Sequence, residues 1–168
     1  MSREKLTRAF LWVSVLGFGI ALGGKLFDLL ILARAWSAAP PASLALLPYG
    51  PRWPMNPGDF FQPLGVPTLV GILGALLSGW KTPFKYRIWL WIPMIIFLII
   101  WPFTIFVFWP MIRELYHAAS GSMVMSDTDL IAVTRRWVTY DWVRVAMIAA
   151  CFVSAIRAIS IPFPRNER

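Results

Sequence analysis

Long apolar segments separated by short polar ones dominate the pattern of this chain. A membrane-spanning helix needs about 20 mostly apolar residues. Four segments meet that length, at about residues 10–32, 60–80, 88–112 and 137–159. A proline-rich stretch separates the first two, and we expect it to form an outer loop. The pattern predicts an all-α fold: an up-down, four-helix transmembrane bundle, formed by a single domain over residues 1–168.

Helix-start signals refine the ends of these segments. Asn56 before Pro57 predicts an N-cap followed by proline at the first helical position. Ser126 with Asp129 three residues later resembles a capping box. No glycine or proline follows until after Ile159, so we predict one continuous helix from Ser126 to Ile159 that begins outside the membrane. Within the proline-rich loop, residues 41–47 favour a short interfacial helix.

Composition agrees with a membrane protein. The chain is 58% hydrophobic and only 14% charged, whereas soluble domains carry about 25% charged residues. The net charge of +8 does not indicate nucleic-acid binding, because no basic stripe with interleaved aromatic residues is present. The basic residues stand at the ends of the apolar segments, as topology determinants and lipid anchors do. Membrane lipids are therefore expected partners, and the oligomeric state is left open.

The distribution of lysine and arginine predicts the orientation. One side carries nine of them, and the other side carries five: Arg3, Lys5, Arg8, Lys81, Lys85, Arg87, Arg157, Arg165 and Arg168 against Arg34, Arg52, Arg113, Arg135 and Arg136. Basic residues accumulate on the cytoplasmic side of membrane proteins. We therefore expect an integral protein of the cytoplasmic (inner) membrane with both termini in the cytoplasm.

Ionisable residues interrupt two of the apolar segments. Lys25 and Asp28 lie in the first, and Asp141 and Arg144 lie in the last. Charges inside a span are costly, are usually paired and mark a functional site. Trp137 shares a helical face with Asp141 and Arg144. In an up-down bundle these groups, together with Arg113, Glu114 and His117 of the third segment, would fall at one depth in the outer part of the membrane.

These residues define the candidate site. A cavity with a few convergent polar groups is the first hypothesis for a ligand site. The candidate catalytic residues are Asp28, Asp141, Arg144 and His117, and the candidate ligand-binding residues are Lys25, Trp137, Tyr140 and Arg113. Arg144 should contact the side chain of Asp28 or Asp141, because an unpaired guanidinium at this depth is expensive.

No metal site or cofactor is expected. Cys151 is the only cysteine and His117 the only histidine. One of each, far apart, cannot build a structural zinc site or supply two imidazoles to a haem. Cys151 lies in the middle of the last segment, flanked by apolar residues, where packing is the expected role.

Three stretches together resemble a known family. They are KLFDLLILARAWSAAPPASL at the end of the first segment, TIFVFWPMIREL at the end of the third, and RRWVTYDWVR at the start of the fourth. They are similar to the anthrone-oxygenase-like family of small four-helix integral membrane proteins. The most specific part is Arg136, Trp137, Asp141, Trp142 and Arg144; family members usually carry Asn at the position of Asp141.

The resemblance implies an α-helical bundle and a reaction. In a few fungal polyketide pathways, relatives oxidise an anthrone to an anthraquinone with O₂ and without an evident cofactor. For this chain it implies that a base removes a proton from a benzylic carbon while a cation stabilises the enolate. Asp141, Asp28 or His117 would be the base, and Arg144 or Lys25 the cation.

The residues themselves leave more than one function open. The first is an oxidoreductase or binding protein for a small lipophilic, aromatic ligand. The second is a non-catalytic membrane protein that associates with another membrane component, in which Lys25 pairs with Asp141 and Asp28 with Arg144 to fix the helix register. A carrier is less favoured, because four helices without a repeat lack the usual inverted-repeat pocket.

Overall fold

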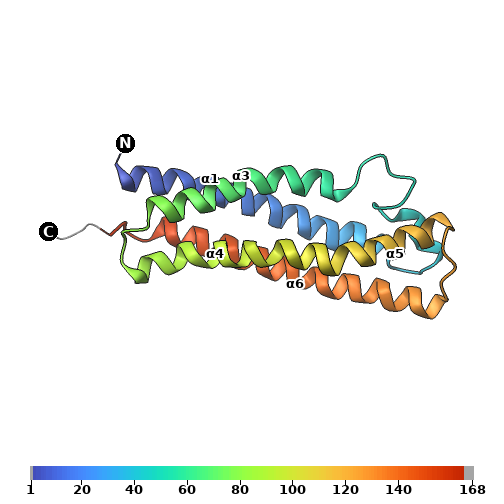
Figure 1. The fold of residues 1–168 in the computed structure, drawn as a ribbon. Coiled ribbons are helices and arrows are strands. Elements are labelled where there is room, and N and C mark those ends of the chain that lie inside the picture. The colour runs from blue at the N-terminus through green and yellow to red at the C-terminus, as the bar shows by residue number, and fades with distance from the viewer. Residues whose placement is uncertain (1, 165–168) are drawn as a thin grey trace. The chain divides into compact units, whose positions relative to one another are not determined.

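A computed structural model describes residues 2–164. Within this range the chain is helical and holds no β-strand, which confirms the predicted fold class. The elements run from α1 to α6 in the order coloured in Figure 1. They are α1 (Arg3–Phe27), the π-helix η1 (Asp28–Ala33), α2 (Arg34–Trp36), the 3₁₀-helix η2 (Ala42–Leu46), α3 (Pro57–Ser78), α4 (Phe84–Phe103), the π-helix η3 (Thr104–Phe108), α5 (Trp109–Ser120) and α6 (Asp127–Ser160).

Four helices are long and apolar enough to cross a membrane. They cover Arg3–Trp36, Pro57–Ser78, Phe84–Ser120 and Asp127–Ser160, because η1 and η3 continue their helices without a break. The predicted spans lie inside these ranges except at the end of the second, which stops at Ser78 rather than at residue 80. The chain is thus a membrane protein, as its composition indicated.

The helix starts follow the sequence signals. The Asn56 side chain accepts a hydrogen bond of 2.8 Å from the Gly58 backbone N–H. The Asn56 backbone N–H in turn donates one of 2.8 Å to the Asp59 carboxylate. The Ser126 hydroxyl accepts a hydrogen bond of 3.1 Å from the Asp129 N–H. These caps satisfy backbone donors that no helix can satisfy internally. The prediction of one continuous helix from Ser126 to Ile159 is confirmed by α6, and the short helix in the loop by η2.

The described residues group into two compact units. The first comprises residues 2–22, 62–99 and 146–164, and the second comprises residues 23–61 and 100–145. Whether the chain counts as one domain stays a prediction. The candidate residues of the sequence analysis lie in the second unit.

Small residues let α1 and α3 approach closely in the first unit. A Cβ atom added at Gly71 would lie 2.9 Å from the Ser14 backbone N and 3.0 Å from the Phe10 carbonyl O. Neither backbone atom can move independently of α1. Helix pairs in membranes pack through such small residues, because lipid tails offer no hydrophobic force to drive them together.

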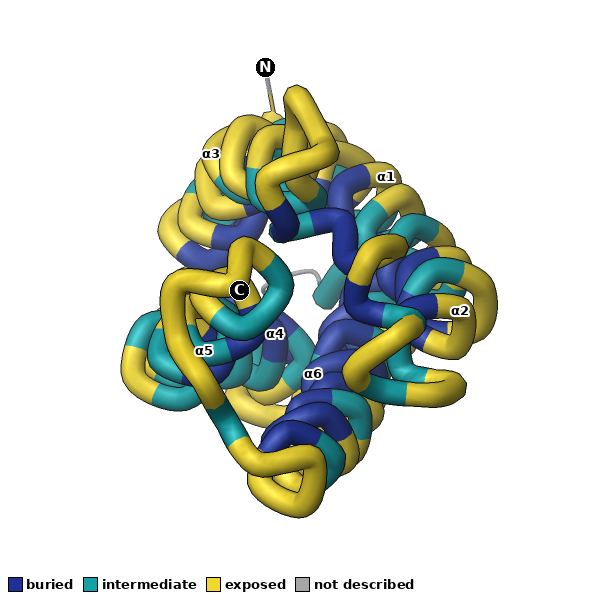
Figure 2. Tube along the Cα trace, turned by 90° about the vertical axis from the view of Figure 1, so that its right-hand side faces the viewer, coloured by how far each residue is buried: buried dark blue, intermediate teal, exposed yellow. Residues whose placement is uncertain are grey.

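In α6 the predicted face is buried. Trp137, Asp141, Arg144 and Ile148 are all classed as buried, and they follow the spacing of one helical side. In Figure 2 the tube of α6 carries buried stretches in dark blue beside exposed ones in yellow. One side of α6 therefore faces the protein, whereas Trp142 and Val143, 47% and 45% exposed, lie on the other.

We predict opposite effects for two glycine-to-alanine substitutions. Gly71→Ala should destabilise the protein by about 1–3 kcal/mol, the usual range for overpacking a well-packed contact. Gly23→Ala is the matched control: it is also helical, and a Cβ there meets nothing within 4 Å. It should be neutral or stabilise by up to about 1 kcal/mol through helix propensity. Thermal unfolding in detergent measures both, and an equal effect of the two variants would contradict the close α1–α3 contact.

Candidate functional site

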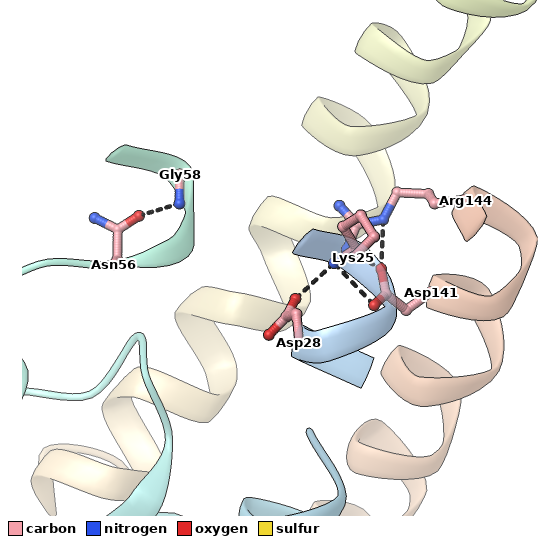
Figure 3. A network of polar contacts seen from close by, with 6 residues as sticks. All are labelled: Lys25, Asp28, Asn56, Gly58, Asp141 and Arg144. Carbon is pink, nitrogen blue, oxygen red and sulfur yellow. Dashed lines mark hydrogen bonds and ion pairs between the residues drawn. The ribbon is translucent and has the colours of Figure 1, made fainter. Parts of the chain in front are cut away.

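Two helical segments bring four buried charges together in the second unit. Lys25 stands in the last turn of α1, Asp28 opens η1, and Asp141 and Arg144 lie on α6. The Lys25 Nζ atom is 2.6 Å from Asp28 Oδ2 and 2.9 Å from Asp141 Oδ2. Figure 3 shows the lysine ammonium between the two carboxylates. We call these four residues the charge cluster.

Asp141 is the centre of the charge cluster. Its side chain is fully buried, and its Oδ1 atom accepts a hydrogen bond of 2.7 Å from Arg144 Nε. Arg144 Nη2 binds the same oxygen. The carboxylate thus lies between a guanidinium on its own helix and an ammonium from α1. The charge cluster has two positive and two negative groups, so it is neutral without any further partner.

Both π-helices border the charge cluster. η1 begins at Asp28, and η3 ends at Phe108. The Arg144 Cζ atom lies 3.3 Å from the centroid of the Phe108 ring. Short π-helical turns within α-helices are frequent at functional sites. The two irregular turns therefore mark the same place as the buried charges.

Aromatic rings enclose the charge cluster. Trp137 makes edge-to-face contacts with Trp36, Phe108 and Tyr49, with ring centroids 5.1, 5.7 and 6.4 Å apart. The Lys25 Nζ atom lies 5.6 Å from the Trp137 centroid. Such rings attract desolvated cations through their electron-rich faces. Trp137, which is fully buried, therefore stabilises the charge cluster as well as packing against the loop.

Several buried polar atoms in the second unit have no hydrogen-bond partner. Within the described residues of the second unit these include Asp28 Oδ1, Trp36 Nε1, Trp137 Nε1 and Thr134 Oγ1. Buried polar atoms are nearly always paired with protein or water, so each exception calls for an explanation. Asp28 uses one oxygen for Lys25 while the other is free to accept a hydrogen bond (Figure 3).

A pocket of about 400 Å³ ends at Asp28. This volume falls within the range of small-molecule sites. Its walls come from the end of α1 with η1, from the start of α3 and from the proline-rich loop, and they are mainly apolar: Gly24, Phe27, Leu32, Pro48, Trp53, Met55, Asn56, Pro57, Phe60 and Phe61. Asp28 is the one ionisable side chain among the lining residues of this pocket. Asp141, Arg144 and Lys25 do not line it.

Tyr49 of the loop adds a neutral hydroxyl near the charge cluster. Burial, and next the Asp28 carboxylate, raise the pKa of the Tyr49 phenol above its ordinary value, and Arg144 opposes them by a smaller amount. The phenol therefore keeps its proton at physiological pH. A neutral O–H can donate a hydrogen bond, whereas a phenolate would be repelled by the carboxylates of Asp28 and Asp141.

The structure brings five of the predicted site residues together and leaves three outside. Lys25, Asp28, Trp137, Asp141 and Arg144 converge as described above. His117 and Arg113 of α5 are exposed, and His117 Nδ1 lies 2.9 Å from the Ser122 hydroxyl instead. Tyr140 is 36% exposed and packs against Phe103 with centroids 6.1 Å apart.

The pairing between helices partly follows the sequence analysis. The predicted contact of Arg144 is confirmed, and its partner is Asp141. The pair of Lys25 with Asp141 is also present. The expected pair of Asp28 with Arg144 is wrong: Asp28 binds Lys25, and no ion pair joins Asp28 to Arg144 among residues 2–164. Lys25 lies between both carboxylates, so it takes the place that Arg144 was expected to have as the partner of Asp28.

Sequence reasoning identified Trp137 but missed the aromatic residues around it and in the pocket. Phe108, Trp36 and Tyr49 surround Trp137, and Phe60 and Phe61 form a wall of the pocket. Aromatic residues are common throughout this chain, so their type alone did not single them out. The only available signal was position: Trp36 and Phe108 fall in two of the stretches that resemble a known family.

Comparison with known proteins places the chain in a family. A family model described as Anthrone oxygenase matches residues 55–154. The match includes Trp137, Asp141 and Arg144 and stops short of Lys25 and Asp28. No curated protein and no solved structure matches the chain.

We predict strong energetic coupling between Lys25 and Asp141. Lys25→Met and Asp141→Leu should each destabilise the protein by about 3–5 kcal/mol, because each leaves a buried charge without its partner. The double variant should cost less than the sum, by about 0.5–3 kcal/mol. Thermal unfolding of a double-mutant cycle in detergent measures this coupling.

Two further cycles serve as controls for this prediction. Arg113→Met combined with Asp141→Leu should be additive, because Arg113 is exposed and makes no ion pair with the charge cluster. A cycle of Asp28 with Arg144 should show weaker coupling than that of Lys25 with Asp141. Stronger coupling between Asp28 and Arg144 would contradict the observed pairing.

Proposed function

Since the chain belongs to the anthrone oxygenase family, we propose that it binds a small aromatic ketone beside Asp28 and oxidises it with O₂ without a cofactor. The observation that supports this most is the free Oδ1 atom of Asp28, on the one ionisable residue that lines an apolar pocket. A carboxylate oxygen with no donor bound to it can accept a proton from a ligand.

The reaction balances without an added reductant or metal. Asp28 accepts a proton from the benzylic carbon between the two rings, and the electron pair of that C–H bond delocalises into the ketone as an enolate. The enolate carbon reduces O₂ and forms a C–O bond to it. The resulting peroxide takes back the proton that Asp28 holds and becomes a hydroperoxide. The second hydrogen of the same carbon then leaves as a proton while the O–O bond breaks, so that the electron pair of the C–H bond forms the carbonyl group. The departing hydroxide and this second proton make one water molecule. One oxygen atom thus ends in the quinone and the other in water.

The other charged residues act as positioning residues in this scheme. Lys25 binds Asp28 Oδ2 at 2.6 Å, which fixes the carboxylate and leaves Oδ1 for the ligand. Asp141 holds Lys25 from the opposite side at 2.9 Å, and Arg144 holds Asp141. Preorganised charges of this kind need no rearrangement during the reaction. Neither cation lines the pocket, so contact of either with the enolate is not part of the proposal.

A non-catalytic role is the second candidate, and one observation favours it. The charge cluster is complete by itself: both cations bind Asp141, and Lys25 also binds Asp28. Such pairs can fix the register of α1 against α6 without chemistry. In that case the protein would associate with another membrane component, and the pocket would only contact lipid or a neighbouring protein.

The orientation in the membrane remains part of the proposal. We place the protein in the cytoplasmic membrane with both termini in the cytoplasm, on the asymmetry of nine to five lysines and arginines. The pocket then lies toward the outer face. A reporter enzyme that works only outside the cytoplasm should be inactive when fused after Arg168 and active when inserted at Ser122. The reverse pattern would overturn the orientation.

We predict that Asp28→Asn lowers the rate of anthrone oxidation by about 10²–10⁴-fold, the usual contribution of a general base. The protein would be reconstituted in lipid nanodiscs, and O₂ consumption and quinone absorbance would be followed, with empty nanodiscs giving the spontaneous rate. Asp28→Asn keeps the shape of the side chain, and Lys25 keeps Asp141 as a partner. The fold should therefore persist.

Asp129→Asn provides the control for that experiment. Asp129 is an exposed carboxylate at the start of α6, outside the pocket, and its variant should oxidise anthrone at the wild-type rate. An Asp28→Asn protein with wild-type activity would remove Asp28 from the mechanism. A wild-type protein no faster than empty nanodiscs would refute the oxygenase function and favour the non-catalytic role.

A further inference from the structure

We propose that the pocket at Asp28 receives its ligand sideways from the lipid bilayer, through an opening flanked by Phe27 and Phe60, and that the ligand is a neutral aromatic molecule dissolved in the membrane. This inference rests on the proposed ligand-binding role of the pocket. It adds the route of entry and the charge of the ligand.

The exposed lining residues of the pocket are mainly apolar. Phe27 and Phe60 are 57% and 50% exposed, and both belong to helices that can cross a membrane. The loop side of the rim carries Met55 and Trp53, also exposed. Exposed aromatic residues at the end of a span are typical of the lipid interface. Asn56 is the one exposed polar side chain among the lining residues, and it lies on the loop side, whereas Phe27 and Phe60 make the helix side apolar.

The loop over the charge cluster is closed by its own packing. Leu44, Leu47 and Pro48 are buried, and the Ser43 hydroxyl donates a hydrogen bond of 2.6 Å to the Trp36 carbonyl. Tyr49 packs against Trp137. These contacts anchor the loop to α2 and α6 and shield the charge cluster on the loop side. The lateral opening is then the direct way for a lipophilic molecule to reach Asp28.

Gly24 lets the rings of Phe60 and Phe61 pack closely against α1 at the pocket. A Cβ atom at Gly24 would lie 3.0 Å from the Phe60 ring and 3.3 Å from the Phe61 ring. Any larger side chain would extend into the space that these rings border and would occupy the pocket. Gly24 lies one turn before Asp28 on the same side of the helix. It therefore controls access to the carboxylate without contacting the charge cluster itself.

The charges select a neutral ligand. An anionic ligand such as a fatty acid would meet the Asp28 carboxylate, while the ammonium of Lys25 already binds two carboxylates. A cationic ligand would have to compete with Lys25, which lies only 2.6 Å from Asp28. A neutral molecule with an O–H donor satisfies the free Oδ1 atom without disturbing the neutral charge cluster. The aromatic walls Phe27, Trp53, Phe60 and Phe61 favour flat rings.

A nitroxide label at position 27 tests the route. The Phe27→Cys variant in a Cys151→Ala background is labelled and reconstituted in nanodiscs. The relaxation of the label by O₂, which concentrates in lipid, is then compared with its relaxation by a water-soluble nickel chelate. Val70→Cys on α3, at a site of similar exposure (54%), is the matched lipid-facing control. Lateral opening predicts that O₂ dominates at both positions. Dominance of the nickel chelate at position 27 would overturn the route.

The same label tests the ligand. Adding 4-hydroxybenzophenone, a neutral aryl ketone with one O–H donor and no benzylic C–H to oxidise, should lower O₂ access at position 27 and leave position 70 unchanged. Gly24→Leu should abolish the effect, and the milder Gly24→Ala should weaken it. Equal changes at both positions, or an unchanged effect in Gly24→Leu, would overturn the pocket as the binding place.

Charge selectivity and catalysis are separated by two comparisons. Benzophenone-4-carboxylate, which has the same rings and a negative charge, should have no effect at position 27; an effect equal to that of the phenol would contradict selection of a neutral ligand. These readouts measure binding and not turnover. If the protein does not oxidise anthrone, but 4-hydroxybenzophenone still lowers O₂ access at position 27, the oxygenase function is refuted and the lateral pocket is supported.

Discussion

The rest of the site depends on the two ion pairs that the buried Asp141 carboxylate makes with Lys25 and Arg144. A charge removed from water in this way is tolerated only with close partners of opposite sign. Asp141 has one partner on its own helix and one on α1, so the same contact that stabilises the charge also joins the two helices. Lys25 is thereby held where it can bind Asp28 as well.

Asp28 belongs both to the charge cluster and to the lining of the pocket. Its Oδ2 atom binds Lys25, its buried Oδ1 atom has no hydrogen-bond partner, and the residue lines an apolar pocket. A fully satisfied carboxylate would be purely structural, and a solvated one would be an ordinary surface group. The oxidation that we propose needs a base in a dry aromatic pocket, and Asp28 is our candidate for that role.

The helices and the charged residues of the site could be predicted from the sequence. The lengths of the apolar segments and the capping residues were sufficient to predict α3 and α6. The charges inside the apolar segments identified Lys25, Asp28, Asp141 and Arg144. The span of the third segment is confirmed, but Arg113 and His117 do not reach the charge cluster. Their depth in an up-down bundle suggested that they would, whereas α5 buries Met111 and Leu115 and leaves Arg113 and His117 exposed. The π-helix η3 before α5 changes which side of the helix faces inward. Residue spacing alone does not reveal such a shift.

Infrared difference spectroscopy of the carboxylates tests the central claim most directly. In protein labelled with ¹³C at the aspartate side-chain carboxyl, addition of 4-hydroxybenzophenone should shift one carboxylate band, because the phenol donates a hydrogen bond to Asp28 Oδ1. The shift should be absent in Asp28→Asn and present in Asp129→Asn. A spectrum that does not change with the ligand, or a shift that survives in Asp28→Asn, would contradict the assignment of Asp28 as the ligand-facing group.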